Sequence, residues 1–342
     1  MRARRGRKTA YLIAVCALVV AGCGGGADEL DEPAESTEFE RALEGVGEGV
    51  APASIGFGWI DIAAIRDVAS PDAVREVAAA LGPGADELLE RSAAIKRTTG
   101  FDPLAADAVT SLGASYAFGV RFQGVKAGRL GALLGEAGAR AYPIGAWTAY
   151  DLGEQGQAST SGPLAALDSL TSRVAIRPGA AILARVDSAR HALLGVGESP
   201  LADERLAFAT ACLGDVEVAR TLPGGFTHNA VASPALIAIG RRPGPSSARG
   251  EVLCAIGDSE ADAERQAEAL TETFAPGATE PLTGEPMTEL VAGAEVDELA
   301  DGDLHAARAR LEPAPAAPPG LLFRALVRGS VLPYVGAPEP IP

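Results

Sequence analysis

The sequence predicts an α+β protein in which antiparallel sheets are covered by helices. Hydrophobic residues make up 47% of the chain, which is enough for a real core. Stretches with alternating apolar residues, typical of strands, are interleaved with stretches of helical period. The dipeptide Asp301-Gly302, favoured in tight hairpin turns, separates two expected strands near the end of the chain.

The folded body is expected to cover residues 51–312. Its first strand, at 54–62, places Ile55, Phe57 and Trp59 on one face. Proline after an N-capping residue begins two of the helices that follow, and a glycine ends each of them. The expected elements are helices at 70–82, 85–97 and 102–113, a strand at 115–122, a helix at 125–137 and a strand at 141–152.

The second part of the body is expected to repeat the order strand, helix, paired strands. A bent strand pair is expected at 173–186, a helix at 201–213, strands at 235–241 and 250–257, a helix at 259–274, and a hairpin of 287–299 with 303–311. The recurring order favours two structurally similar halves, about 51–152 and 173–312, which would indicate a distant internal duplication.

The C-terminal segment, residues 313–342, begins rich in proline and continues as an apolar helix at 320–336. This helix is too short to span a membrane. Because it is apolar nearly all round, we expect it to dock on the core. Contact with a membrane surface or a partner is the alternative.

The N-terminal segment, residues 1–22, has the features of a secretory signal. Five basic residues precede an apolar run at 10–20, and about 11 residues are too few to cross a bilayer. Val20-Ala21-Gly22-Cys23 resembles a bacterial lipobox. That resemblance implies cleavage before Cys23 and a diacylglycerol thioether on its sulfur, with acyl chains that anchor the protein. The alternative is a plain secretory signal with a chance cysteine.

An acidic, flexible tether is expected at residues 23–50. Thr37 and Glu40 have the spacing of a capping box, which predicts a short helix inside this tether. The whole chain carries a net charge of −16, and loss of the basic signal would make the remainder more acidic still. This charge excludes nucleic acid as an expected partner, because binding its phosphates requires positive charge.

The cysteines predict one disulfide. The chain has four: Cys16 leaves with the signal and Cys23 carries the lipid, so that Cys212 and Cys254 remain. A single pair in an oxidising compartment favours a bridge. Two buried free thiols are the alternative.

No motif for catalysis, a metal or a cofactor is present in the sequence. His191, His228 and His305 lie far apart, and neither a zinc-binding spacing nor a G-x-S-x-G nucleophile elbow occurs. We therefore expect no catalytic residues, no metal and no cofactor.

Two groups of residues have both a functional and a structural interpretation. Asp297, Asp301 and Asp303 could bind calcium, but a solvated hairpin turn is the better interpretation. Three aromatic residues, Trp59, Trp147 and Tyr150, could line a binding groove. They are better explained as residues of the core or of a strand face.

Several short segments resemble uncharacterised lipoproteins of actinobacteria. They are Thr99-Gly100-Phe101-Asp102-Pro103-Leu104, Ala211-Cys212-Leu213-Gly214-Asp215, Glu251-Val252-Leu253-Cys254, Ala275-Pro276-Gly277-Ala278-Thr279 and the helix at 320–336. The resemblance extends over most of the chain after the signal. It implies an envelope location and the cysteine pair, and it implies no activity.

From these observations we expect a lipid-anchored protein on the outer face of the cell membrane that binds or scaffolds in the envelope and is not an enzyme. Its expected partners are the membrane and an unknown protein or apolar ligand. One alternative is a carrier of an apolar ligand, which requires a large cavity between helices and sheet. Another is a hydrolase without a recognisable motif, which requires ionisable groups clustered in a cleft.

Overall fold

The computed structural model describes residues 28–29, 36–47, 56–68, 74–75, 77–82, 84–113, 117–154, 162–167, 171–224, 234–244, 249–318, 320–328 and 331–336. The expected signal at 1–22 and the lipidation residue Cys23 lie outside these ranges. So does half of the expected tether, residues 23–27, 30–35 and 48–50.

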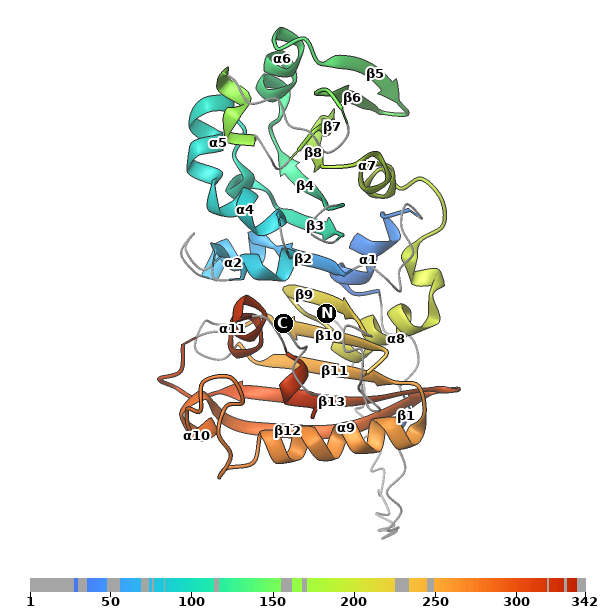
Figure 1. Ribbon diagram of the computed structural model, residues 1–342, viewed down its shortest axis with the longest axis vertical. Coiled ribbons are helices and arrows are strands. Elements are labelled where there is room, and N and C mark those ends of the chain that lie inside the picture. Colours follow the sequence, from blue (N-terminus) through green and yellow to red (C-terminus); the bar gives the residue numbers. More distant parts are fainter. Residues whose placement is uncertain are drawn as a thin grey trace, which may run out of the picture.

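The fold is α+β and is built on one continuous sheet rather than several (Figure 1). Among the described residues the strand order is β1-β12-β13-β11-β10-β9-β2-β3-β4-β8-β7-β6-β5. Neighbours pair antiparallel, except that the two-residue β1 pairs parallel with β12. The strands are β1 Asp28–Glu29, β2 Phe57–Asp61, β3 Ala108–Leu112, β4 Gly119–Val125, β5 Arg140–Ile144, β6 Trp147–Asp151, β7 Arg173–Arg177, β8 Gly179–Ala184, β9 Val218–Pro223, β10 Leu236–Arg241, β11 Glu251–Gly257, β12 Val291–Asp301 and β13 Leu304–Pro313.

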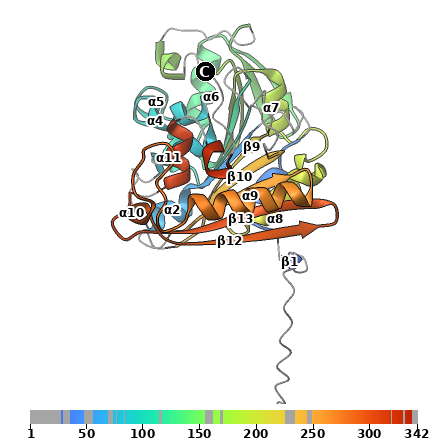
Figure 2. The ribbon, with the colours of Figure 1, turned by 60° about the horizontal axis from the view of Figure 1, so that its bottom comes forward.

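Helices cover both faces of the sheet (Figures 1 and 2). They are α1 Glu38–Glu44, α2 Ile62–Val68, α4 Ala85–Glu90, α5 Ser92–Thr99, α6 Gly128–Glu136, α7 Asp187–Leu193, α8 Glu204–Leu213, α9 Glu260–Thr273, α10 Met287–Leu290 and α11 Leu321–Arg328. Short 3-10 helices are η2 Ala78–Leu81, η3 Pro103–Ala105, η4 Gly162–Leu167, η5 Pro200–Ala202 and η6 Leu332–Val335.

Alternation along the strands divides the core into two buried clusters, one on each face of the sheet. Phe57 and Trp59 of β2 belong to the cluster that includes buried residues of α1, α7 and α8. Ile60 belongs to the cluster with buried residues of α4, α5, α6, α9 and α11. The expected orientation of Phe57 and Trp59 is therefore confirmed, while Ile55 lies outside the described residues.

The structure does not confirm two structurally similar halves. Around the central β2–β9 pair the strand order is β2-β3-β4-β8-β7 on one side and β9-β10-β11-β13-β12 on the other, but only the first side continues into β6 and β5. The proposed boundary between residues 152 and 173 also separates β6 from β7, which pair directly. The duplication therefore stays a prediction.

Local signals were misleading at three places. Residues 102–113, expected as a helix, form η3 and then β3, because β2 and β4 offer hydrogen-bond partners on both sides of that strand. The expected strand at 141–152 is the hairpin β5–β6, and the expected helix at 85–97 divides at Arg91 into α4 and α5. Strand β9 was not expected.

Helix α1 belongs to the body, so the flexible tether expected to reach residue 50 ends earlier. The capping box of Thr37 and Glu40 is confirmed. Phe39 and Leu43 are buried at 1% and 0% exposure. The guanidinium of Arg121, on β4, donates hydrogen bonds to the carbonyl oxygens of Ala42 and Gly45 at 3.0 and 2.6 Å. These contacts hold the last turn of α1 against the sheet.

The C-terminal segment docks on the body as expected. It consists of α11 followed by η6, and Leu322 and Phe323 are fully buried. Both carboxylate oxygens of Glu251, on β11, accept from the backbone N–H of Leu322 at the start of α11. Within the described ranges, no helix has the length and apolar character required to cross a membrane.

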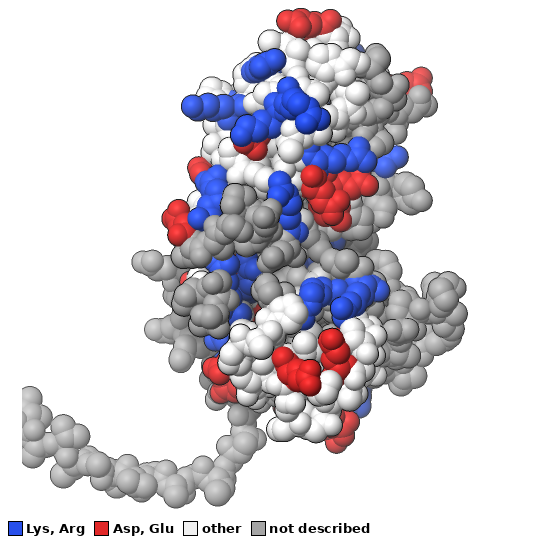
Figure 3. Space-filling model, turned by 90° about the vertical axis from the view of Figure 1, so that its left-hand side faces the viewer, with Lys and Arg blue, Asp and Glu red and all other residues white. Residues whose placement is uncertain are grey.

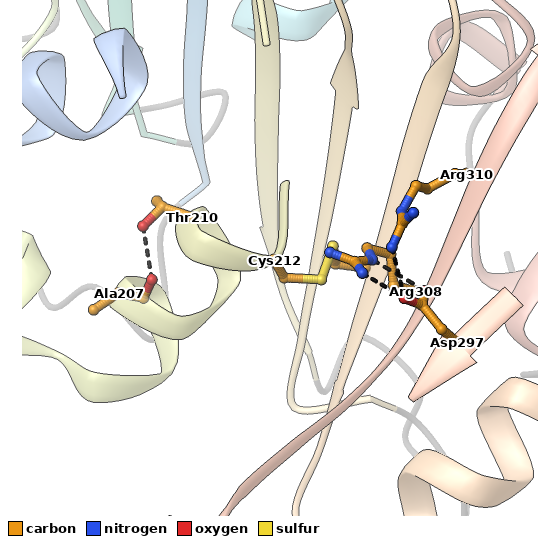
Figure 4. Close-up of a disulfide and its surroundings, with 7 residues drawn as sticks. Ala207, Thr210, Cys212, Asp297, Arg308 and Arg310 are labelled. Carbon is orange, nitrogen blue, oxygen red and sulfur yellow. Dashed lines mark hydrogen bonds and ion pairs between the residues drawn. A yellow bond between two sulfur atoms is a disulfide. The ribbon is translucent and has the colours of Figure 1, made fainter. Parts of the chain in front are cut away.

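The predicted cysteine pair lies at disulfide distance. The bridge joins Cys212 near the end of α8 to Cys254 in the middle of β11, with 6.3 Å between the Cα atoms (Figure 4). Both residues are buried, at 1% and 0% exposure. The disulfide therefore fastens a helix of one face directly to the sheet.

Candidate functional site

A pocket of about 410 Å³ opens to solvent among the helices beside β2 and β3. Its lining residues are Arg66, Val74, Arg75, Ser92, Ala93, Lys96, Asp102, Leu104 and Ala105. They come from α2, residues 74–75, α5, and η3 with the Asp102 that precedes it, and none lies on a strand. The volume falls in the range of small-molecule binding sites.

The turn after α5 brings an acidic group to a basic one. Gly100 ends α5 in a left-handed conformation, φ 73°, which only glycine adopts without strain. The chain then reverses, and the Asp102 side chain accepts from the N–H of Leu104 at 3.2 Å to cap η3. This reversal places Asp102 Oδ2 2.7 Å from Lys96 Nζ.

Arg66 reaches the same wall from a different segment. Helix α2 begins directly after β2, where Asp61 accepts from the N–H of Ala64 at 2.8 Å. One turn later the Arg66 guanidinium donates to the carbonyl oxygen of Leu104 at 3.1 Å and lies 3.5 Å from Asp107. Arg66 therefore ties α2 to η3, and about a third of its side chain remains exposed.

The polar groups of the pocket are mainly cationic. The hydrogen bond to Asp102 raises the pKa of Lys96 above its already basic ordinary value. The Ser92 residue is 1% exposed, and its hydroxyl has no hydrogen-bond partner in the described part of the chain. Figure 3 faces the side that carries α2 and α5 and shows basic side chains gathered over its upper and middle parts. The remaining walls are apolar.

The aromatic residues weighed as a groove belong to the core. Trp59 is 2% exposed and packs near Phe39, with ring centroids 6.1 Å apart. Trp147 is 8% exposed and lies under the guanidinium of Arg177, 4.5 Å from its ring centroid. Tyr150 packs against the other hydrophobic cluster. Neither tryptophan lines the pocket described above.

In the acidic hairpin β12–β13, Asp297 forms ion pairs with arginines of the neighbouring strand. Asp297 accepts from Arg308 Nε at 3.0 Å and from Arg310 at 2.7 Å, next to the disulfide (Figure 4). Asp301 and Asp303 lie at the exposed hairpin end. No group of three His, Cys, Asp or Glu residues that could hold a metal occurs within the described ranges. His228 lies outside them, as does Cys23.

One buried carboxylate has a strongly shifted pKa, but its position is structural. Burial raises the pKa of Glu251 to about 7, against the opposing effect of its hydrogen bond from Leu322 and of nearby arginines. The space beside it measures about 10 Å³, room for no more than one water molecule. Glu251 caps α11 and has no room for a substrate.

A second group of ionisable residues lies around Arg190, which is 1% exposed. Its guanidinium contacts Asp151 at 2.7 Å and Asp187 at 2.5 Å, and Arg173 lies 3.1 Å from Asp187. The two aspartates are thus held by arginines that join β6, β7 and α7. This arrangement fixes strands rather than activating a carboxylate.

Sequence reasoning did not find the pocket residues. Only Lys96 offered a signal, because the chain has just three lysines and Lys96 lies in an otherwise acidic protein. The lining as a whole comes from four separate segments, so no single spacing along the chain could reveal it.

Comparison with known proteins assigns neither a family nor a function to this chain. No family model, no curated protein and no solved structure matches this chain. The resemblance to actinobacterial lipoproteins therefore stays a prediction.

Proposed function

We propose that this protein is a lipid-anchored binding protein of the bacterial cell envelope that holds a small ligand in the pocket formed by α2, α5 and η3. The observation that carries the binding role is the pocket itself: about 410 Å³, apolar walls and a few convergent polar groups. The signal-like N-terminus and the lipobox-like Val20-Ala21-Gly22-Cys23 support the location. The cysteine pair at disulfide distance fits an oxidising compartment.

The two alternatives fit the geometry less well. A carrier for an apolar ligand requires a cavity between helices and sheet, whereas this pocket opens to solvent and has no strand residue in its lining. A hydrolase requires ionisable groups clustered in a cleft, whereas the described pocket lining holds a single carboxylate, Asp102, and Glu251 is buried under α11. Ligand binding without catalysis therefore agrees best with the residues present.

Replacing Ala93 by tryptophan is expected to abolish ligand binding, because the indole would fill the pocket from the exposed face of α5. Native mass spectrometry of the full chain, purified from its own membranes in a neutral detergent, should show a small-molecule adduct on the wild type and none on Ala93→Trp. Arg97→Trp is the matched control, since Arg97 is exposed on the same helix and does not line the pocket. The same adduct on all three proteins, or an adduct on none of them, would refute the binding role.

Replacing Cys23 by serine is expected to abolish lipidation completely, because serine has no sulfur to form the thioether. In a bacterial host that processes lipoproteins, the wild-type N-terminal peptide should begin at Cys23 and carry a diacylglycerol mass. Cys23→Ser should carry neither the cleavage nor the added mass. Wild-type protein recovered from the cytosol with Met1 and no added mass would contradict the proposed location.

A further inference from the structure

The charge of the pocket is opposite to that of the protein. The chain carries −16, yet the pocket lining contains three cationic residues, Arg66, Arg75 and Lys96, and one carboxylate, Asp102. A cationic depression on an acidic protein attracts anions locally, while the rest of the surface repels them.

Lys96 and Arg66 have N–H groups beyond those engaged by their described protein partners. The Lys96 ammonium has three N–H donors, of which the described residues engage one through Asp102, and 64% of its side chain is exposed. The Arg66 guanidinium has five donors and, within the described ranges, donates to the Leu104 carbonyl and lies 3.5 Å from Asp107. Both side chains can therefore add a charged hydrogen bond to an incoming anion.

The rest of the lining is apolar. Val74, Ala93, Leu104 and Ala105 present hydrocarbon to the pocket, and Val74 is 1% exposed. An apolar group placed against these walls is removed from water, which favours binding. A bare inorganic anion would leave these walls uncovered, so the lining fits a ligand with two chemically different ends.

We propose that the pocket binds a small anionic amphiphile, with its carboxylate-type headgroup at Lys96 and Arg66 and its short apolar body against Val74, Ala93 and Leu104. This inference rests on the proposed binding function and specifies the ligand class. The probe for it is hexanoate, with hexanamide as the neutral analogue of the same shape and hexylammonium as the analogue of opposite charge.

Calorimetric titration of the full chain in neutral maltoside micelles, with micelles alone as the blank, should show binding of hexanoate. Lys96→Met should weaken it about tenfold, the value of one charge-assisted hydrogen bond. Lys126→Met is the control, because Lys126 is the other lysine after the signal and does not line the pocket. Asp102→Asn should bind severalfold more tightly, since the ammonium of Lys96 loses its competing carboxylate.

Equal binding of hexanoate and hexanamide, or equal loss in Lys96→Met and Lys126→Met, would overturn the anionic class. If hexanoate does not bind but the native adduct disappears in Ala93→Trp, the ligand class is wrong and the binding function stands. If neither hexanoate nor a native adduct binds, both proposals fail. Binding of hexylammonium in preference to hexanoate would place the charge selection on Asp102 instead.

Discussion

Replacing Cys212 and Cys254 together by alanine is expected to lower the free energy of unfolding by about 4 kcal/mol, the chain-entropy value for a loop of this length. The bridge closes a loop with a sequence separation of 42 residues. Without it, the unfolded chain gains conformations, while α8 loses its covalent link to β11. Urea denaturation of the oxidised wild type and of the double variant measures the difference.

Reductant supplies the control for this prediction. Because both cysteines are buried, reduction should require unfolding, and wild-type protein unfolded in reductant should then match the stability of the double variant. The variant itself should not respond to reductant. Two thiols that react in denatured, unreduced wild-type protein would contradict the bridge.

Replacing Glu251 by glutamine is expected to stabilise the protein at alkaline pH and much less at acidic pH. Burial raises the pKa of Glu251 from an ordinary 4.5 to about 7, so the protonated form is favoured in the folded state. Its contribution to stability is therefore fully present below the unfolded pKa and is lost as the pH rises through 7. Between about pH 4 and about pH 8, the stability difference should move by about 3 kcal/mol in favour of the variant.

The glutamine keeps an oxygen that can accept from the N–H of Leu322, so the cap of α11 survives the substitution. Glu295→Gln is the matched control, because Glu295 is 70% exposed and pairs with Arg310 at the surface. Its effect should change by less than about 0.5 kcal/mol over the same range. Urea denaturation at both pH values measures all three proteins. A stability difference for Glu251→Gln that is independent of pH would contradict the buried charge.

The candidate site could be predicted from the sequence only in part. Lys96 and Asp102 are six positions apart, and the reversal at Gly100 that joins them has a recognisable sequence. Arg66, however, reaches the pocket only because α2 packs beside η3, and Val74 comes from a further segment of the chain. The cationic character of the site is invisible in a composition dominated by acidic residues.

Local patterns were reliable where neighbours along the chain decide the structure. The capping box of α1 and the amphipathic helix α9 are present where the sequence placed them. The hairpin β12–β13 turns at Asp301-Gly302 as expected, although residues 287–290, expected in its first strand, form α10. In each case the determining contacts lie within a few residues or across one turn. The cysteine pair could also be predicted, because elimination left only two thiols.

The sequence by itself determined the α+β class, most of the strands and helices, and the pairing of Cys212 with Cys254. Only the tertiary structure decided that residues 108–112 form a central strand, that α1 packs into the body, and that a cationic pocket lies between α2 and α5. The physical reason is that strand pairing, burial and charge at these places depend on partners far away in the chain. Local propensity and periodicity contain no information about such partners.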